Sequence, residues 1–184
     1  MAESKPTDTE PKTPTARIIA GCLTVIGVAL SLFQLYTAGM VAMTAMRHRS
    51  VFLTCILAMT FLIKPLYKGA RKDKFNFAMF IDLILIAMAV FIGFYIFIDL
   101  QGIFERQGDW SPWDFRVGVA LVLLVLEATR RVIGLNLTVI AVMFLLFGYF
   151  GPWMPELIVH KGYSVERIAT TLSLTTEGIF GLPL

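Results

Sequence analysis

The residues best placed to carry chemistry are charged side chains within or beside long apolar stretches. Asp82 lies about one helical turn into an apolar stretch that runs from residue 77 to residue 98. An acid at such a depth could move a proton or hold an ion, because charged groups inside membrane segments are costly and are commonly functional. The more ordinary role is a salt bridge or hydrogen bond to a neighbouring helix or to the basic segment 68–74. We favour that structural role, and the ion role stays open.

A second charged group closes another apolar stretch. Glu127 is followed by Arg130 and Arg131, at spacings of three and four residues. On a helix these spacings bring the carboxylate beside both guanidinium groups. The pattern predicts ion pairs that lower the cost of charge near a membrane interface, and a structural role is again favoured.

Three further polar positions are candidates for contacts with other molecules. Arg47 and Arg49 flank His48 between two apolar stretches, where they could meet lipid headgroups or an external protein. The sequence does not separate these two possibilities. Glu177 stands among apolar residues near the C-terminus, and we expect it to hold a surface helix against a neighbouring domain.

Other kinds of site are absent from the sequence. His48 and His160 lie outside the apolar stretches, so the facing histidine pairs that hold membrane haem are missing. There is no HExxH motif, no cluster of Cys and His, and no glycine-rich phosphate loop. We therefore expect no catalytic residue, no metal site, no cofactor and no enzymatic activity.

Composition places these residues in a membrane protein. Hydrophobic residues make up 57% of the chain and charged residues only 16%, and the charges are bunched between long apolar stretches. Soluble domains carry nearer a quarter charged residues. The net charge of +3 needs no nucleic-acid partner, since positive charge beside membrane segments follows from topology. The pattern predicts an all-α membrane protein.

The elements that must position the charged residues are about five transmembrane helices. The group 127–131 divides the last two stretches, because three charges at mid-membrane would be too costly. Ser164 is a suitable N-cap for an amphipathic helix that begins at Val165. This helix is expected to lie at the outer membrane surface or to pack under a larger domain. The five predicted helices cover residues 18–41, 51–66, 77–98, 115–126 and 135–153.

Charge also predicts the orientation. With a cytoplasmic N-terminus, ten of the sixteen Lys and Arg residues fall on the inside and six on the outside. This is the expected bias for an inner-membrane protein. The three tryptophans then all lie on the outer side, as interfacial residues do. The expected regions are a disordered cytoplasmic tail over 1–16, a four-helix membrane region over 17–134, and a fifth helix with the amphipathic segment over 135–184.

Several motifs carry a family resemblance. They are Ser31–Gly39 (SLFQLYTAG), Glu127–Arg131 (EATRR), Gly151–Pro152 and, most specifically, Leu174–Gly181 (LTTEGIFG). Together they resemble the fused membrane component of TRAP (tripartite ATP-independent periplasmic) transporters, of the TAXI subtype. The resemblance covers nearly all of the chain after the tail.

The resemblance implies a function that the residues alone do not show. Such transporters import organic acids, such as dicarboxylates, 2-oxoglutarate or glutamate, with a sodium gradient and a periplasmic substrate-binding protein. The first four helices would correspond to the small subunit, a scaffold, and the fifth to the start of the large permease domain. Arg47 and Arg49 become candidate contacts for the binding protein.

The resemblance also limits what this chain is expected to do. Family members continue for several hundred residues beyond the motif that ends at Gly181, and their discontinuous helices hold the substrate and sodium. We therefore assign no substrate or sodium ligand here, and expect a chain that does not transport alone. The alternative is an anchoring or assembly subunit of another inner-membrane complex.

Overall fold

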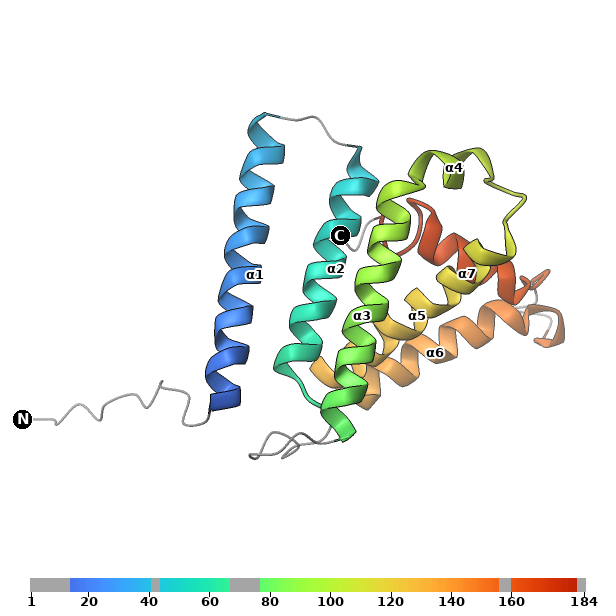
Figure 1. Ribbon diagram of the computed structural model, residues 1–184. Coiled ribbons are helices and arrows are strands. Elements are labelled where there is room, and N and C mark those ends of the chain that lie inside the picture. The colour runs from blue at the N-terminus through green and yellow to red at the C-terminus, as the bar shows by residue number, and fades with distance from the viewer. Residues whose placement is uncertain (1–13, 41–43, 67–76, 156–159, 182–184) are drawn as a thin grey trace, which may run out of the picture.

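The computed structural model describes residues 14–40, 44–66, 77–155 and 160–181, and within these ranges every regular element is a helix. The predicted all-helical fold is thus confirmed for the described residues (Figure 1). The elements, in chain order, are α1 (Pro14–Gly39), α2 (Ala45–Ile63), α3 (Phe77–Ile98), α4 (Leu100–Glu105), α5 (Pro112–Val132), α6 (Leu135–Tyr149), the 3-10 helix η1 (Gly151–Trp153) and α7 (Val165–Leu174).

Three of the described helices, α1, α2 and α3, are long and apolar enough to cross a membrane. They run alternately up and down, and α1 stands at one side of the molecule (Figure 1). The span of α1 has none of its residues buried inside the protein, whereas α2 and α3 each bury one face. Such apolar helices, exposed on the protein surface, suit a lipid surrounding.

The core lies between α2, α3 and α5. Phe61 of α2, Ile92 of α3 and Leu121 of α5 are all buried in one hydrophobic cluster. Leu174 and Phe180, at the end of the described chain, belong to the same cluster. The C-terminal segment therefore completes the core rather than lying free.

Local signals fix both ends of α5. Ser111 caps its N-terminus by accepting a hydrogen bond from the N–H of Trp113, and Pro112 occupies the first helical position. At the other end Gly134 adopts a φ of 112°, a left-handed conformation that glycine permits, and the chain turns into α6. The fourth and fifth stretches are thus separate helices, as predicted, but the division lies at Gly134, after the charged group 127–131 rather than within it.

The helix α7 begins at Val165, as predicted, with the Ser164 hydroxyl accepting from the N–H of Arg167 at 3.2 Å. It packs against α5, where Gly118 allows close approach: a Cβ there would lie 2.6 Å from Oγ of Ser173. The face of α7 that is buried carries Ala169, Thr170, Ser173 and Leu174. This amphipathic helix thus packs on its own chain, and its predicted place at the membrane surface stays a prediction.

The structure departs from the predicted boundaries at four helices. α1 covers Pro14–Gly39 rather than 18–41, so its start is helical where the predicted disordered tail over 1–16 ends. α2 begins at Ala45, six residues before the apolar stretch. Arg47 and Arg49 are accommodated in its first turns by contacts with the Phe97 ring and with carbonyls of the C-terminal segment. α5 continues through the charged group to Val132, and α6 ends at Tyr149 with only 15 residues. Residues 1–13 of the predicted tail, and the basic segment 68–74, lie outside the described residues.

Candidate functional site

Arg131 is the centre of a charged cluster at one end of the bundle, which we call the inner network. Its Nη1 donates to Asp82 Oδ1 at 2.5 Å, joining α5 to α3, and its Nε donates to Glu127 Oε1 at 2.7 Å. Glu127 also accepts from Arg130 at 2.7 and 2.8 Å. The two acids and two arginines therefore balance one another.

The inner network also reaches α2. Nη1 of Arg131 donates to the carbonyl of Lys64 at 3.1 Å, and the guanidinium lies 5.0 Å from the centre of the Phe61 ring. Only 2% of the Arg131 side chain and 9% of the Asp82 side chain are exposed, so the ion pair between them is shielded from water. A buried, paired Asp82 is what the structural interpretation predicts, and Asp82 forms its bridge to a helix.

A second charged cluster, the outer network, lies at the opposite end of α3 and α5. Arg106 donates to Asp99 at 2.5 Å and to Asp114 at 3.1 Å. Asp114 is fully buried and also accepts from the Tyr95 hydroxyl at 2.7 Å and from the N–H of Ser111 at 3.0 Å. This carboxylate thus ties α3, the segment before α5, and α5 itself together.

Electrostatics keep the outer network charged. Hydrogen bonds to Asp114 and then to Asp99 raise the pKa of Arg106 above its ordinary value. Burial alone would raise the pKa of Asp114, but hydrogen bonds from Arg106, Tyr95 and Ser111 outweigh burial and hold it below its usual value. Near neutral pH neither group exchanges protons, so the network is an anchor rather than an acid–base pair.

Sequence reasoning missed Asp114 as a structural residue, although a signal was present. Ser111 and Asp114 stand at the spacing of a capping box, in which each side chain bonds the backbone of the other, with Pro112 between them. The partners Tyr95 and Arg106 carried no comparable signal, because their contact depends on how the loop folds over α3.

The arginines predicted to meet a binding protein contact their own chain. Nη1 of Arg49 donates to the carbonyls of Phe180 and Gly181 at 2.5 and 3.1 Å. The guanidinium of Arg47 lies 5.8 Å from the centre of the Phe97 ring of α3. Arg49 therefore fastens the C-terminal segment to the start of α2.

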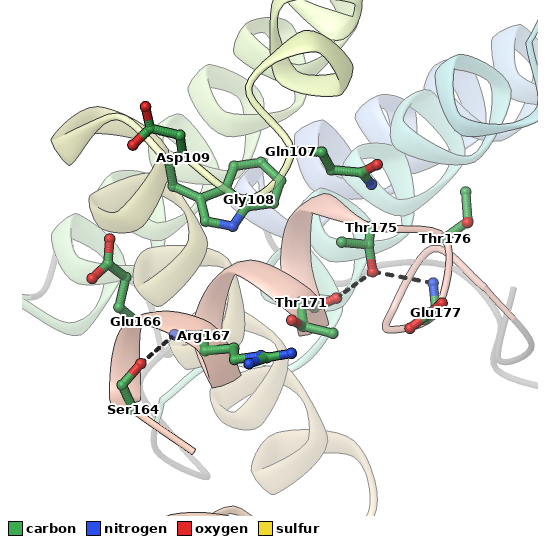
Figure 2. A pocket seen from close by; sticks show the side chains of 11 residues that line it. Gln107, Gly108, Asp109, Ser164, Glu166, Arg167, Thr171, Thr175, Thr176 and Glu177 are labelled. Carbon is green, nitrogen blue, oxygen red and sulfur yellow. Dashed lines mark hydrogen bonds between the residues drawn. The ribbon is translucent and has the colours of Figure 1, made fainter.

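The described residues also line a groove of about 680 Å³, which we call the polar groove (Figure 2). The loop that carries Gln107, Gly108 and Asp109 lies across from α7 (Figure 2). Glu177 is exposed at this groove, and its N–H donates to Thr175 Oγ1 at 3.2 Å. The lining residues are Gln107–Trp110, Ser164, Glu166, Arg167, Thr171 and Thr175–Glu177.

Both histidines make contacts within the folded chain. Nδ1 of His160 accepts from the N–H of Gly162 at 3.0 Å, so its Nε2 carries the proton and donates to the carbonyl of Phe147 at 3.1 Å. His48 stacks on Phe33 with ring centres 5.7 Å apart. Among the residues that the structure describes, no three His, Cys, Asp or Glu side chains gather as a metal site would require.

The predicted site residues thus fall into separate groups. Asp82, Glu127, Arg130 and Arg131 come together in the inner network, Arg49 holds the C-terminal segment, and Glu177 faces the polar groove. The arrangement can hold helices in place and offer a polar groove to another molecule. Compared with known proteins, the chain matches no family model, no curated protein and no solved structure.

Proposed function

We propose that this chain is the scaffold region of a TRAP-type secondary transporter that imports organic acids with a sodium gradient. In this role it anchors a transport domain, fused or separate, and works with a periplasmic substrate-binding protein. The motif resemblance from Ser31 to Gly181 suggests the family. The observation that carries the scaffold role is the inner network, in which Arg131 joins α2, α3 and α5.

The inner network supports the proposed scaffold role, because its charged groups pair with one another inside the bundle. Removing a buried arginine from water is costly, and Asp82, Glu127 and the Lys64 carbonyl offset that cost. A rigid bundle is what a transport domain that moves within a membrane requires as a fixed reference. The outer network strengthens the other end of the same bundle.

The surface supports the same proposal. The apolar residues of α6 are largely exposed, and none of its residues is buried. We infer that α5 and α6 are the fourth and fifth membrane helices, that the N-terminus is cytoplasmic, and that the protein lies in a bacterial inner membrane. α1 and α6 then offer surfaces to lipid or to the transport domain.

Deletion of the gene in its native bacterium tests the proposal. Uptake of labelled 2-oxoglutarate, glutamate and C4-dicarboxylates would be measured with and without sodium, and again after the full-length gene is restored. We expect sodium-dependent uptake of at least one acid to fall to background and to return on complementation. Unchanged uptake of every acid under inducing conditions would contradict the transport role.

The second candidate is an anchoring subunit of another inner-membrane complex. The same surfaces would serve it, and the exposed α6 favours it equally. Purification of the tagged full chain in a mild detergent separates the two candidates. A large permease domain, in the same polypeptide or bound to it, is expected for the transporter, whereas other complex subunits would favour the anchor.

A further inference from the structure

A second hollow, of about 480 Å³, adjoins the polar groove on the side of α6, and we call it the apolar hollow. Its apolar lining residues are Phe144 and Leu145 from α6 and Ile168 and Leu172 from α7. The apolar hollow and the polar groove share three lining residues, Arg167, Thr171 and Glu177. One molecule with a polar head and an apolar tail could therefore occupy both.

The charges of the polar groove restrict what that head can be. Among its described lining residues, Arg167 is the one cation, and Asp109, Glu166 and Glu177 are acids. All four side chains are exposed and within reach of a ligand. The guanidinium of Arg167 lies 5.5 Å from the centre of the Tyr163 ring, and none of the ion pairs between described residues includes it.

We propose that these two hollows bind a phospholipid with a primary-amine zwitterionic head, as in phosphatidylethanolamine. Arg167 and the Thr171 hydroxyl bind the phosphate, because a guanidinium fork matches phosphate oxygens. The acids bind the ammonium, and one acyl chain lies in the apolar hollow along α6. An anionic head without an amine would meet three carboxylates and only one cation, and a choline head has no N–H to donate to them.

The position of the hollows agrees with a bilayer source for this ligand. The apolar hollow lies toward the C-terminal end of α6, and the polar groove is lined by Trp110. Indole rings are enriched at the level of lipid headgroups. With the N-terminus in the cytoplasm this is the outer leaflet. The inference requires the chain to lie in a membrane, and it does not depend on which solute, if any, the protein helps to import.

Lipid retention by the full chain tests the site. The protein would be purified in detergent, exchanged into micelles that contain equal amounts of phosphatidylethanolamine, phosphatidylglycerol and phosphatidylcholine, and analysed by native mass spectrometry. Arg167→Gln removes the phosphate partner. Arg116→Gln is the matched control, since Arg116 is also exposed and also lies over an aromatic ring, that of Trp113 at 5.1 Å.

We expect the wild type to retain phosphatidylethanolamine preferentially. Arg167→Gln should weaken retention about two- to fivefold, the range for an exposed charge pair, while Arg116→Gln should leave it unchanged. The double variant Glu166→Gln, Glu177→Gln should reduce the preference over phosphatidylglycerol, because it removes the ammonium partners. Equal retention of the three lipids by the wild type, or equal losses in both arginine variants, would overturn the proposal.

Discussion

Substitution of Asp82 by Asn tests how much the inner network depends on one carboxylate. Only 2% of the Arg131 side chain is exposed, so the variant leaves a buried cation with Glu127 as its remaining acid. We expect a loss of about 3 kcal/mol, near the lower end for breaking a buried ion pair. Thermal unfolding in detergent, followed by circular dichroism, measures it, and the exposed Asp109→Asn should change stability by less than about 0.5 kcal/mol.

The same variant decides between the two roles left open for Asp82. If the acid is structural, stability and any uptake fall together. If it carries a proton or an ion, Asp82→Asn would abolish uptake while its unfolding temperature stayed at the wild-type value. That second outcome would contradict the structural role assigned to the inner network.

Acidification should weaken the outer network through Asp114. Its pKa in the folded protein lies below its ordinary value, so it contributes stability above the unfolded pKa of about 3.9, and that contribution is lost as pH falls through the folded pKa. The wild type and Asp114→Asn should therefore differ most in unfolding temperature near pH 6 and converge toward pH 3. A constant difference across this range would contradict the linkage.

Among the elements, the contact between α2 and α3 depends on a glycine. A Cβ on Gly93 would collide with the side chain of Thr54, whereas a Cβ on Gly27 of α1 would meet no atom within 4 Å. Both glycines lie inside helices, so alanine gains similar helix propensity at each, about 1 kcal/mol. The two positions thus form a matched pair.

We expect Gly93→Ala to destabilise the protein by about 1–3 kcal/mol, the usual cost of overpacking. Gly27→Ala should stabilise the protein by up to about 1 kcal/mol, because the gain in helix propensity meets no collision there. Unfolding temperatures of the two variants in the same detergent give the comparison. Equal changes in unfolding temperature for the two variants would show that α2 and α3 move apart readily at Gly93.

The helices also show which elements a sequence can specify. The bounds of α3 were predictable to the residue, because the apolar stretch is flanked by Lys74 and Asp99. The start of α2 was not predictable, because the charged residues Arg47 and Arg49 are typical of a polar loop. They are tolerated in a helix through contacts with Phe97 and with carbonyls up to 132 positions away, and no local pattern reveals such partners.

Among the charged sites, too, some contacts could be predicted from the sequence and others could not. The pairing of Glu127 with Arg130 and Arg131 follows from helical spacing and was predictable. That Asp82 would be paired was favoured, but its particular partner depends on how α3 packs beside α5. The polar groove could not be predicted, because it forms only where the loop 107–110 meets α7.

At the scale of the whole molecule, the predicted topology can be tested by labelling. Cysteines would be placed at Gly69, between α2 and α3, and at Gln107, after α3, in a background with Cys22 and Cys55 replaced by Ala. A membrane-impermeant maleimide should label position 107 in intact cells and position 69 only after the membrane is opened. Labelling of both from one side would contradict a membrane-crossing α3.

The short length of α6 has a consequence for the surrounding lipid. Its 15 residues extend about 22 Å, less than the roughly 30 Å of a typical hydrocarbon layer, and its apolar side chains face outward. If α6 spans the membrane, thinning of the bilayer beside it would accommodate this difference, at a modest cost for each ångström of hydrophobic mismatch. The protein should then be more stable in nanodiscs of lipids with 14-carbon chains than with 20-carbon chains, and membrane thickness would itself act on its assembly.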